Sequence, residues 1–245
     1  MDHLPCAGKR VAFFGGSFDP PHQGHVAVAR AARLALSLDT VLFAPVGAQP
    51  LKPLGSTASF EDRLAMTRLA IAGEPGFAVS RIDAPNLDGV PNYTLETLLR
   101  LRAELPPDGT LFCLMGADSF FGLSRWHRSA EIPFAAPLVV ASRPGQPLDD
   151  LRAALPLGLD MEAAPDALLP GCASSDSSVE VRCYLLRNSS GETAPLYVLP
   201  GLNVEISASQ VREQIQGDPE VSQPSPPFLS RSVLEYIRSR GLYRS

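Results

Sequence analysis

The chain has 245 residues and is 45% hydrophobic, which suffices for one large α/β domain with a sizeable core. Its formal net charge is −5 at pH 7, and no cluster of lysine and arginine of the nucleic-acid-binding kind is present, so we expect no DNA or RNA partner. No apolar run reaches the roughly 18 residues of a membrane span, and the four cysteines include no Cys-x-x-Cys pair. We therefore expect a cytoplasmic protein with free thiols and no membrane partner.

Short apolar runs alternate with helical patterns along the first two thirds of the chain. Strands are expected at 10–14, 40–46, 77–82, 110–115 and 137–142, and helices at 24–38, 60–72 and 94–105. Continuous apolar strands separated by helices indicate a parallel sheet that is covered on both faces. The sequence therefore predicts an α/β fold with a Rossmann-like, doubly wound parallel sheet, in which ligands bind at the carboxyl ends of the strands.

The last third of the chain has a different composition. Residues 146–202 are rich in proline, alanine and serine, and we expect them to form an insertion with short strands at 179–186 and 196–199. A short strand is predicted at 204–206, followed by a helix that a capping box of Ser207 and Gln210 begins and Gly217 ends. A final helix is predicted from about 227 to 240. We thus expect a single domain over 1–245 with a C-terminal helical segment.

The most informative segment follows the first expected strand. Gly15 and Gly16 allow a tight turn, and a helix begins just beyond it near His22 and His25. Backbone N–H groups and the positive end of the helix dipole favour a phosphate at such a turn. Taken alone, the two histidines leave three interpretations open, namely half of a metal site, a structural pair, or phosphate ligands. Asp19 is expected to brace the turn or cap the helix rather than bind a metal.

The run Gly-Gly-Ser-Phe-Asp-Pro-x-His-x-Gly-His at 15–25 resembles the signature of the HxGH nucleotidyltransferases. Enzymes of this family transfer a nucleotidyl group from a nucleoside triphosphate to an acceptor and release pyrophosphate. Residues 206–212 resemble the family's second motif, Ile-Ser-x-(Ser/Thr)-x-x-Arg, which implies a clamp for the departing pyrophosphate. Without the first motif, the preferred interpretation of this second segment would be an ordinary capped surface helix with a solvated arginine.

The resemblance implies an ATP site built from both motifs. The implied catalytic residues are His22, His25 and Arg212. The implied ATP-binding residues are Gly15, Gly16, Ser17, Phe18, His22, His25, Gly116, Asp118, Ser207, Ser209 and Arg212. We expect Mg²⁺ to bridge the triphosphate and to be held by phosphate oxygens and water, because no cluster of carboxylates in the sequence demands a protein-bound metal.

Within this family, most of the chain resembles the nicotinate-nucleotide adenylyltransferases. Residues 91–98 look like their Pro-x-Tyr-Thr-x-x-Thr-Leu, and 115–119 resemble their Gly-x-Asp-(Ser/Ala) turn. The resemblance implies nicotinate mononucleotide as the acceptor, bound by Lys52, Tyr93, Thr94, Trp126 and Arg143. A hydroxyl and backbone N–H groups suit a carboxylate, and an aromatic face suits a pyridinium ring. Packing at a surface edge is the alternative role for Trp126.

Two features depart from the family pattern. The loop after the second strand carries Gln-Pro-Leu-Lys at 49–52, where the family has Pro-Pro-His-(Lys/Arg), so Leu51 replaces a histidine. The segment 146–202 is also longer than expected. The alternatives are a sister transferase using nicotinamide mononucleotide, phosphopantetheine or a CTP-dependent acceptor, and a nucleotide-binding module without turnover. The sequence leaves the formation of a homo-oligomer open.

Overall fold

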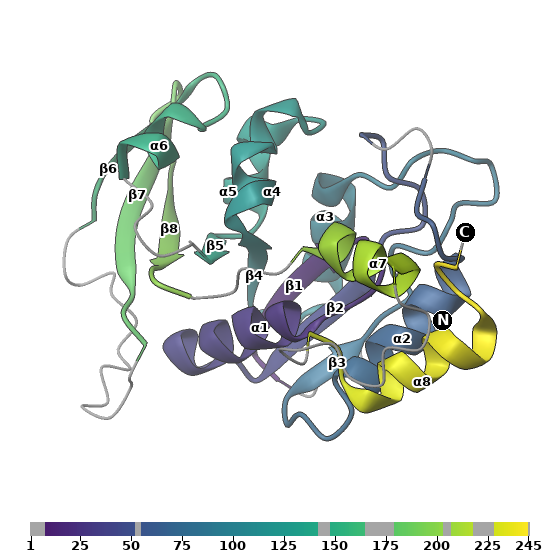
Figure 1. Cartoon of the computed structure of the whole chain (residues 1–245). Coiled ribbons are helices and arrows are strands. Elements are labelled where there is room, and N and C mark those ends of the chain that lie inside the picture. The colour runs from purple at the N-terminus through teal and green to yellow at the C-terminus, as the bar shows by residue number, and fades with distance from the viewer. Residues whose placement is uncertain are drawn as a thin grey trace.

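The centre of the protein is one eight-stranded sheet with the order β3-β2-β1-β4-β5-β8-β7-β6 (Figure 1). The computed structural model describes residues 8–51, 55–141, 148–164, 179–202, 207–217 and 228–244. The strands are β1 (Arg10–Gly16), β2 (Thr40–Pro45), β3 (Phe77–Val79), β4 (Thr110–Gly116), β5 (Leu138–Ala141), β6 (Leu159–Ala163), β7 (Arg182–Asn188) and β8 (Thr193–Leu199).

Six of these strands are parallel, namely β1 to β5 and β8, and β7 and β6 complete the sheet in antiparallel pairing. From β1 the chain moves outward to β2 and β3, and then returns to place β4 on the other side of β1. This reversal creates a topological switch point between β1 and β4. The predicted Rossmann-like, doubly wound fold is therefore confirmed.

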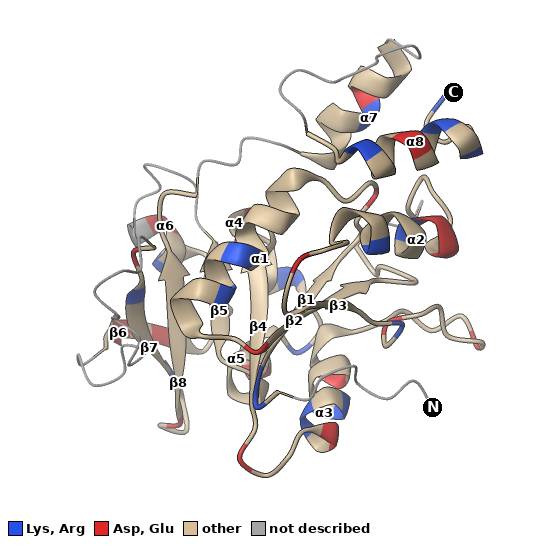
Figure 2. Ribbon diagram, turned by 90° about the horizontal axis from the view of Figure 1, so that it is seen from below, with Lys and Arg blue, Asp and Glu red and all other residues tan. Residues whose placement is uncertain are grey.

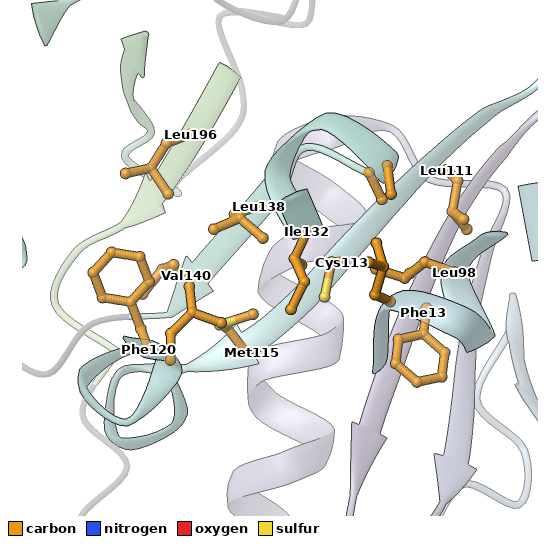
Figure 3. Close-up of a cluster of buried hydrophobic side chains, with 14 of the residues drawn as sticks. Phe13, Leu98, Leu111, Cys113, Met115, Phe120, Ile132, Leu138, Val140 and Leu196 are labelled. Carbon is orange, nitrogen blue, oxygen red and sulfur yellow. The ribbon is translucent and has the colours of Figure 1, made fainter. Parts of the chain in front are cut away.

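Helices cover both faces of the sheet. Each parallel strand contributes to two cores, because neighbouring strand residues point to opposite faces. On β1, Val11 and Phe13 belong to a core formed with α3 (Thr94–Glu104), α4 (Ala117–Phe121) and α5 (Ile132–Ala135), part of which Figure 3 shows. Ala12 and Phe14 belong to the opposite core, formed with α1 (Gln23–Leu36). The central strands β2, β4 and β5 contain no charged residue, whereas acidic and basic residues gather on the helices and outer strands (Figure 2).

A third apolar cluster joins the C-terminal helices to the first half of the chain. It contains Met66 of α2 (Phe60–Ala70), Val211 of α7 (Ala208–Gly217) and Val233 of α8 (Arg231–Arg240). The predicted capping box of α7 is confirmed, because the Ser207 N–H donates to Gln210 Oε1 at 2.9 Å and the Gln210 N–H donates to Ser207 Oγ at 3.2 Å. Through the third apolar cluster, the C-terminal helical segment packs beside α2 (Figures 1 and 2).

Several elements differ from the sequence predictions. Strand β3 ends at Val79 because the chain turns at 81–84, and α8 begins at Arg231 behind an N-cap serine, Ser230. Helices α4 and α5 have five and four residues, too short to show a helical period. Within 146–202, α6 (Leu148–Ala153) and β6 were not predicted, and β8 pairs with β5, so this segment continues the sheet. The strand predicted at 204–206 lies outside the described residues.

The described cysteines are Cys113, which is buried on β4, and Cys183 on β7, and both are free thiols. In the ranges given above, no helix combines the length and the apolar character needed to cross a bilayer.

Candidate functional site

A cavity of about 610 Å³ lies at the carboxyl ends of β1 and β4, where the strand order reverses. It brings together the turn after β1, the loop after β2, the start of α3, the turn after β4 and the start of α7. The predicted site residues that line it are Gly15, Gly16, Ser17, Phe18, His22, His25, Tyr93, Thr94, Gly116, Asp118, Trp126, Ser207, Ser209 and Arg212. The other two, Lys52 and Arg143, lie outside the described residues.

The two histidines stand at the start of α1 and form a local pair. His22 is the N-cap residue in an extended conformation, and its backbone N–H donates to Nδ1 of His25 at 3.1 Å. The centres of the two rings are 3.8 Å apart. Because Nδ1 of His25 accepts a hydrogen bond, a neutral His25 ring carries its hydrogen on Nε2 and can donate it to a ligand.

Burial keeps both rings uncharged in the free protein. It lowers the pKa of His22 to about 4, and it lowers the pKa of His25 well below its usual range, with a smaller contribution from the neighbouring His22. The His25 ring also contacts the edge of Phe18, with 5.0 Å between the ring centres. Two neutral imidazoles offer hydrogen bonds without the repulsion that two adjacent cations would have.

The Asp19 side chain fixes the turn between β1 and α1 through hydrogen bonds. Its buried carboxylate accepts hydrogen bonds from the backbone N–H groups of Thr57 at 2.6 Å and Ala58 at 3.1 Å, and from the Tyr243 hydroxyl at 2.6 Å. Bracing was one of the two roles predicted for this residue, and the other is excluded because His22 caps α1. The carboxylate therefore connects the turn to the start of α2 and to the C-terminal end of the chain.

Arg63 of α2 supports the same turn, and the sequence carried no signal for it. Its side chain is only 2% exposed and donates to three backbone carbonyls, those of Ser17 at 2.7 Å, Val46 at 2.8 Å and Ala58 at 3.3 Å. Burial lowers the pKa of Arg63, which the negative charge of Asp19 opposes. An arginine in a helix ordinarily faces solvent, so a pattern of residue types does not distinguish this one.

Arg212 joins the two sequence motifs across 193 positions of the chain. Its Nη1 donates to the backbone carbonyl of Asp19 at 2.7 Å, and its Nη2 donates to Ser209 Oγ at 3.2 Å. The second motif is therefore not an isolated surface helix, because its arginine contacts the glycine turn directly.

The other end of the cavity is formed by α3 and the segment after α4. Tyr93 is the N-cap residue of α3, and in the described part of the protein no side chain caps this helix, so its first N–H groups can serve a ligand. Trp126 packs against the first core and also lines the cavity, so the packing role and the binding role are compatible. His127 stacks on Tyr93 with 4.5 Å between ring centres, and its Nε2 lies 3.7 Å from Glu96.

Further polar residues, which sequence analysis did not single out, also line the cavity. Arg125 and His127 flank Trp126, and this adjacency was the available signal. Asp83 follows β3, and burial raises its pKa to about 6 although the Thr97 hydroxyl donates to it. Leu51, which stands where the family has a histidine, also lines the cavity and is 45% exposed, so an apolar side chain replaces a polar one there.

Residues 13–214 match a protein family described as cytidylyltransferase-like. A curated protein of Citrifermentans bemidjiense, named "probable nicotinate-nucleotide adenylyltransferase", is 34% identical over 96% of this chain and 98% of its own length. A protein of Stenotrophomonas maltophilia with the same name is 37% identical over 95% and 96%. Among solved structures, nicotinic acid mononucleotide adenylyltransferase of Plasmodium falciparum complexed with NaAD has the same fold, with a TM-score of 0.64 at 14% identity over 96% of this chain and 97% of that chain.

Proposed function

Because this chain belongs to the cytidylyltransferase-like family and, within it, to the nicotinate-nucleotide adenylyltransferases, we propose that it transfers the adenylyl group of ATP to nicotinate mononucleotide. The products are nicotinate adenine dinucleotide and pyrophosphate, an exchange that belongs to NAD biosynthesis. The observation that carries the proposal is that one cavity holds the histidine pair and Arg212 together with Thr94 and Trp126. In this proposal residues 1–245 act as a single nucleotidyltransferase domain, including the segment 146–202.

The acceptor brings its own nucleophile in the proposed reaction. A phosphate monoester has a second pKa of about 6 and is mostly dianionic at neutral pH, so no general base is needed. One of its oxygens attacks the α-phosphorus of ATP, a new P–O bond forms, and the bond to the bridging oxygen of the β-phosphate breaks. The electron pair of the broken bond leaves with pyrophosphate. The protein therefore has to align the two phosphates and stabilise the growing charge.

His22 and His25 are proposed to donate hydrogen bonds to the phosphate oxygens at the reacting centre. Their position beside the N-terminus of α1 supports this role, since backbone N–H groups there also favour an anion. Arg212 is proposed to hold the β- and γ-phosphates, with Ser207, Ser209 and the start of α7 nearby. Gly15, Gly16, Ser17 and Phe18 would supply the turn that receives the triphosphate.

Magnesium fits this site as the complex of ATP rather than as a resident ion. Both carboxylate oxygens of Asp19 already accept hydrogen bonds, and in the part of the chain that the structure describes no three His, Cys, Asp or Glu side chains group around a point where an ion could sit. Bound to the triphosphate, Mg²⁺ would neutralise part of its charge.

The acceptor is proposed to occupy the end of the cavity at α3. The Thr94 hydroxyl and the first N–H groups of α3 would bind the nicotinate carboxylate, and Trp126 would stack on the pyridine ring. Tyr93 would form the wall beside it. Asp118 after β4 would contact a ribose, with Gly116 leaving room for the nucleotide. Lys52 and Arg143 are proposed as cations for the acceptor phosphate.

The test is an acceptor comparison with the purified protein and magnesium ATP. Nicotinate mononucleotide, nicotinamide mononucleotide and phosphopantetheine are supplied in turn, pyrophosphate release is measured, and the dinucleotide is identified by mass spectrometry. We expect efficient release with nicotinate mononucleotide only. Equal or better release with another acceptor would make the protein a sister transferase. ATP binding without acceptor-dependent release would make it a nucleotide-binding module without turnover.

A further inference from the structure

We propose that Tyr243, near the C-terminus, is a positioning residue for the ATP phosphates. Its hydroxyl fixes the Asp19 carboxylate, and Asp19 in turn fixes the turn that leads into His22 and anchors Arg212. This inference rests on the proposed function, because it assigns the turn to ATP.

The contact between Tyr243 and Asp19 is buried and local to the site. The hydroxyl donates to Asp19 Oδ1 at 2.6 Å, and the two residues are 5% and 4% exposed. Burial raises the pKa of Tyr243, and the hydrogen bond to Asp19 raises it further, so the hydroxyl remains a donor over the whole working range of pH. Tyr243 also has a φ of 63°, in the left-handed region that a residue other than glycine occupies when its surroundings hold it there.

The turn needs such support because its own backbone is strained. Phe18, directly before Asp19, has a φ of 48°. The carbonyl of Asp19 accepts the hydrogen bond from Arg212 at 2.7 Å, so a displacement of Asp19 also displaces the guanidinium. The segment that leads into α8 contacts the turn a second time, where the Gln23 N–H donates to the Phe228 carbonyl at 2.8 Å. The C-terminal segment therefore holds the turn on both sides of His22.

The Tyr243 hydroxyl also affects the electrostatics of the site, because Asp19 is charged. A carboxylate in a turn that receives a triphosphate repels the ligand, and donors on its oxygens reduce this repulsion by directing the positive ends of their dipoles at the carboxylate. Oδ2 accepts from the Thr57 N–H, and Oδ1 accepts from the Ala58 N–H and the Tyr243 hydroxyl. Without the hydroxyl, Oδ1 retains one of these two donors. Both the position of the turn and the local field at the phosphates then change.

The same end of the chain offers a matched control. Tyr236 of α8 also donates its hydroxyl to an aspartate, Asp62 Oδ1, at 2.9 Å, but neither residue lines the cavity. Y243F and Y236F each delete one hydroxyl that serves one carboxylate, and each keeps the ring that packs in or beside the third apolar cluster. Both variants are expected to lose some thermal stability, so stability alone does not separate a positioning role from a structural one.

The experiment measures kcat, the KM for each substrate, the Kd for ATP by calorimetry, and Tm for both variants. We expect Y243F to lower kcat/KM for ATP by about tenfold, the scale of one hydrogen bond to a charged group, and to weaken ATP binding. The KM for nicotinate mononucleotide should stay within about twofold, since the acceptor end is not braced by Asp19. Y236F should leave all three kinetic parameters unchanged.

Equal kinetics in Y243F and Y236F would overturn the inference, because Tyr243 would then serve only the fold. D19N tests the same link from the other partner. If Tyr243 acts through Asp19, adding Y243F to D19N should cost less than Y243F alone, and multiplicative losses would contradict the mechanism. Calorimetry with ATP needs no acceptor, so it decides the inference even if nicotinate mononucleotide proves to be the wrong substrate. The failure of one proposal can thus be told from the failure of the other.

Discussion

Asp83 is a buried carboxyl in the wall of the cavity, and D83N measures what its charge costs the folded protein. The Thr97 hydroxyl donates to it, and Arg100 lies 3.7 Å away with its side chain 53% exposed. Burial outweighs both and raises the pKa of Asp83 from 3.8 to about 6. Asparagine has nearly the same shape and resembles the protonated acid, so the substitution removes the titration and little else.

The sign and size of the effect follow from the two pKa values. Between pH 3.8 and about 6 the folded protein holds a proton that the unfolded chain has lost, so the contribution of Asp83 to stability is full below pH 3.8 and disappears as the pH rises through about 6. The whole shift corresponds to about 3 kcal/mol, of which about 2 kcal/mol is lost between roughly pH 4.5 and pH 8. D83N is neutral throughout and escapes this loss.

The assay is urea unfolding of both proteins over this pH range, followed by circular dichroism and by the fluorescence of Trp126, the single tryptophan. The unfolding free energy of D83N minus that of the unmodified protein should rise by about 2 kcal/mol between roughly pH 4.5 and pH 8. All other titrating groups are common to both proteins and cancel. D88N makes the same chemical change at an exposed position and serves as the control. A difference for D83N that stays constant with pH would refute the reasoning, because Asp83 would then be hydrated in the folded state.

Four further substitutions test the site. His22→Ala or His25→Ala should lower kcat by about 100-fold or more, the scale of losing one transition-state donor, and near-normal turnover would remove that residue from the reacting centre. Trp126→Ala should raise the KM for nicotinate mononucleotide far more than the KM for ATP, and an equal rise in both would move Trp126 out of the acceptor pocket. Arg63→Met should lower the unfolding free energy by about 3 kcal/mol or more, because three buried carbonyls lose their donor, and a loss under about 1 kcal/mol in urea unfolding would mean that water replaces the guanidinium.

The central sheet and the start of both motifs could be predicted because their signals are local. Uninterrupted apolar runs indicated β2, β4 and β5, since strands covered on both faces have no polar side. The glycine pair at 15–16 indicated the turn, and the capping box at 207–210 indicated the start of α7. In each case a few consecutive residues determine the structure, so a single sequence is enough.

The supports of the site could not be predicted, because their partners are distant or have no side-chain signature. Arg63 binds three backbone carbonyls, and any residue type can supply a carbonyl. Tyr243 meets Asp19 across 224 positions, and nothing near either residue indicates the other. Strand β6 and the pairing of β7 and β8 with the main sheet were missed for a different reason: the proline- and serine-rich composition suggested an insertion of loops and short strands, although strands overlapping β7 and β8 were predicted.

The way these charges are held suits the proposed binding of a triphosphate in a buried site. Arg63 is oriented by three carbonyls, and Arg212 by one carbonyl and the Ser209 hydroxyl. These neutral partners fix a guanidinium without cancelling its positive charge as a paired carboxylate would. The single carboxylate of the turn, Asp19, is engaged by three donors. His22 and His25 are neutral in the free protein, so the cavity does not bear two adjacent buried cations before its ligand arrives. In the proposed function the triphosphate meets these rings as neutral hydrogen-bond donors, and His25 donates through Nε2 because its Nδ1 accepts the His22 N–H.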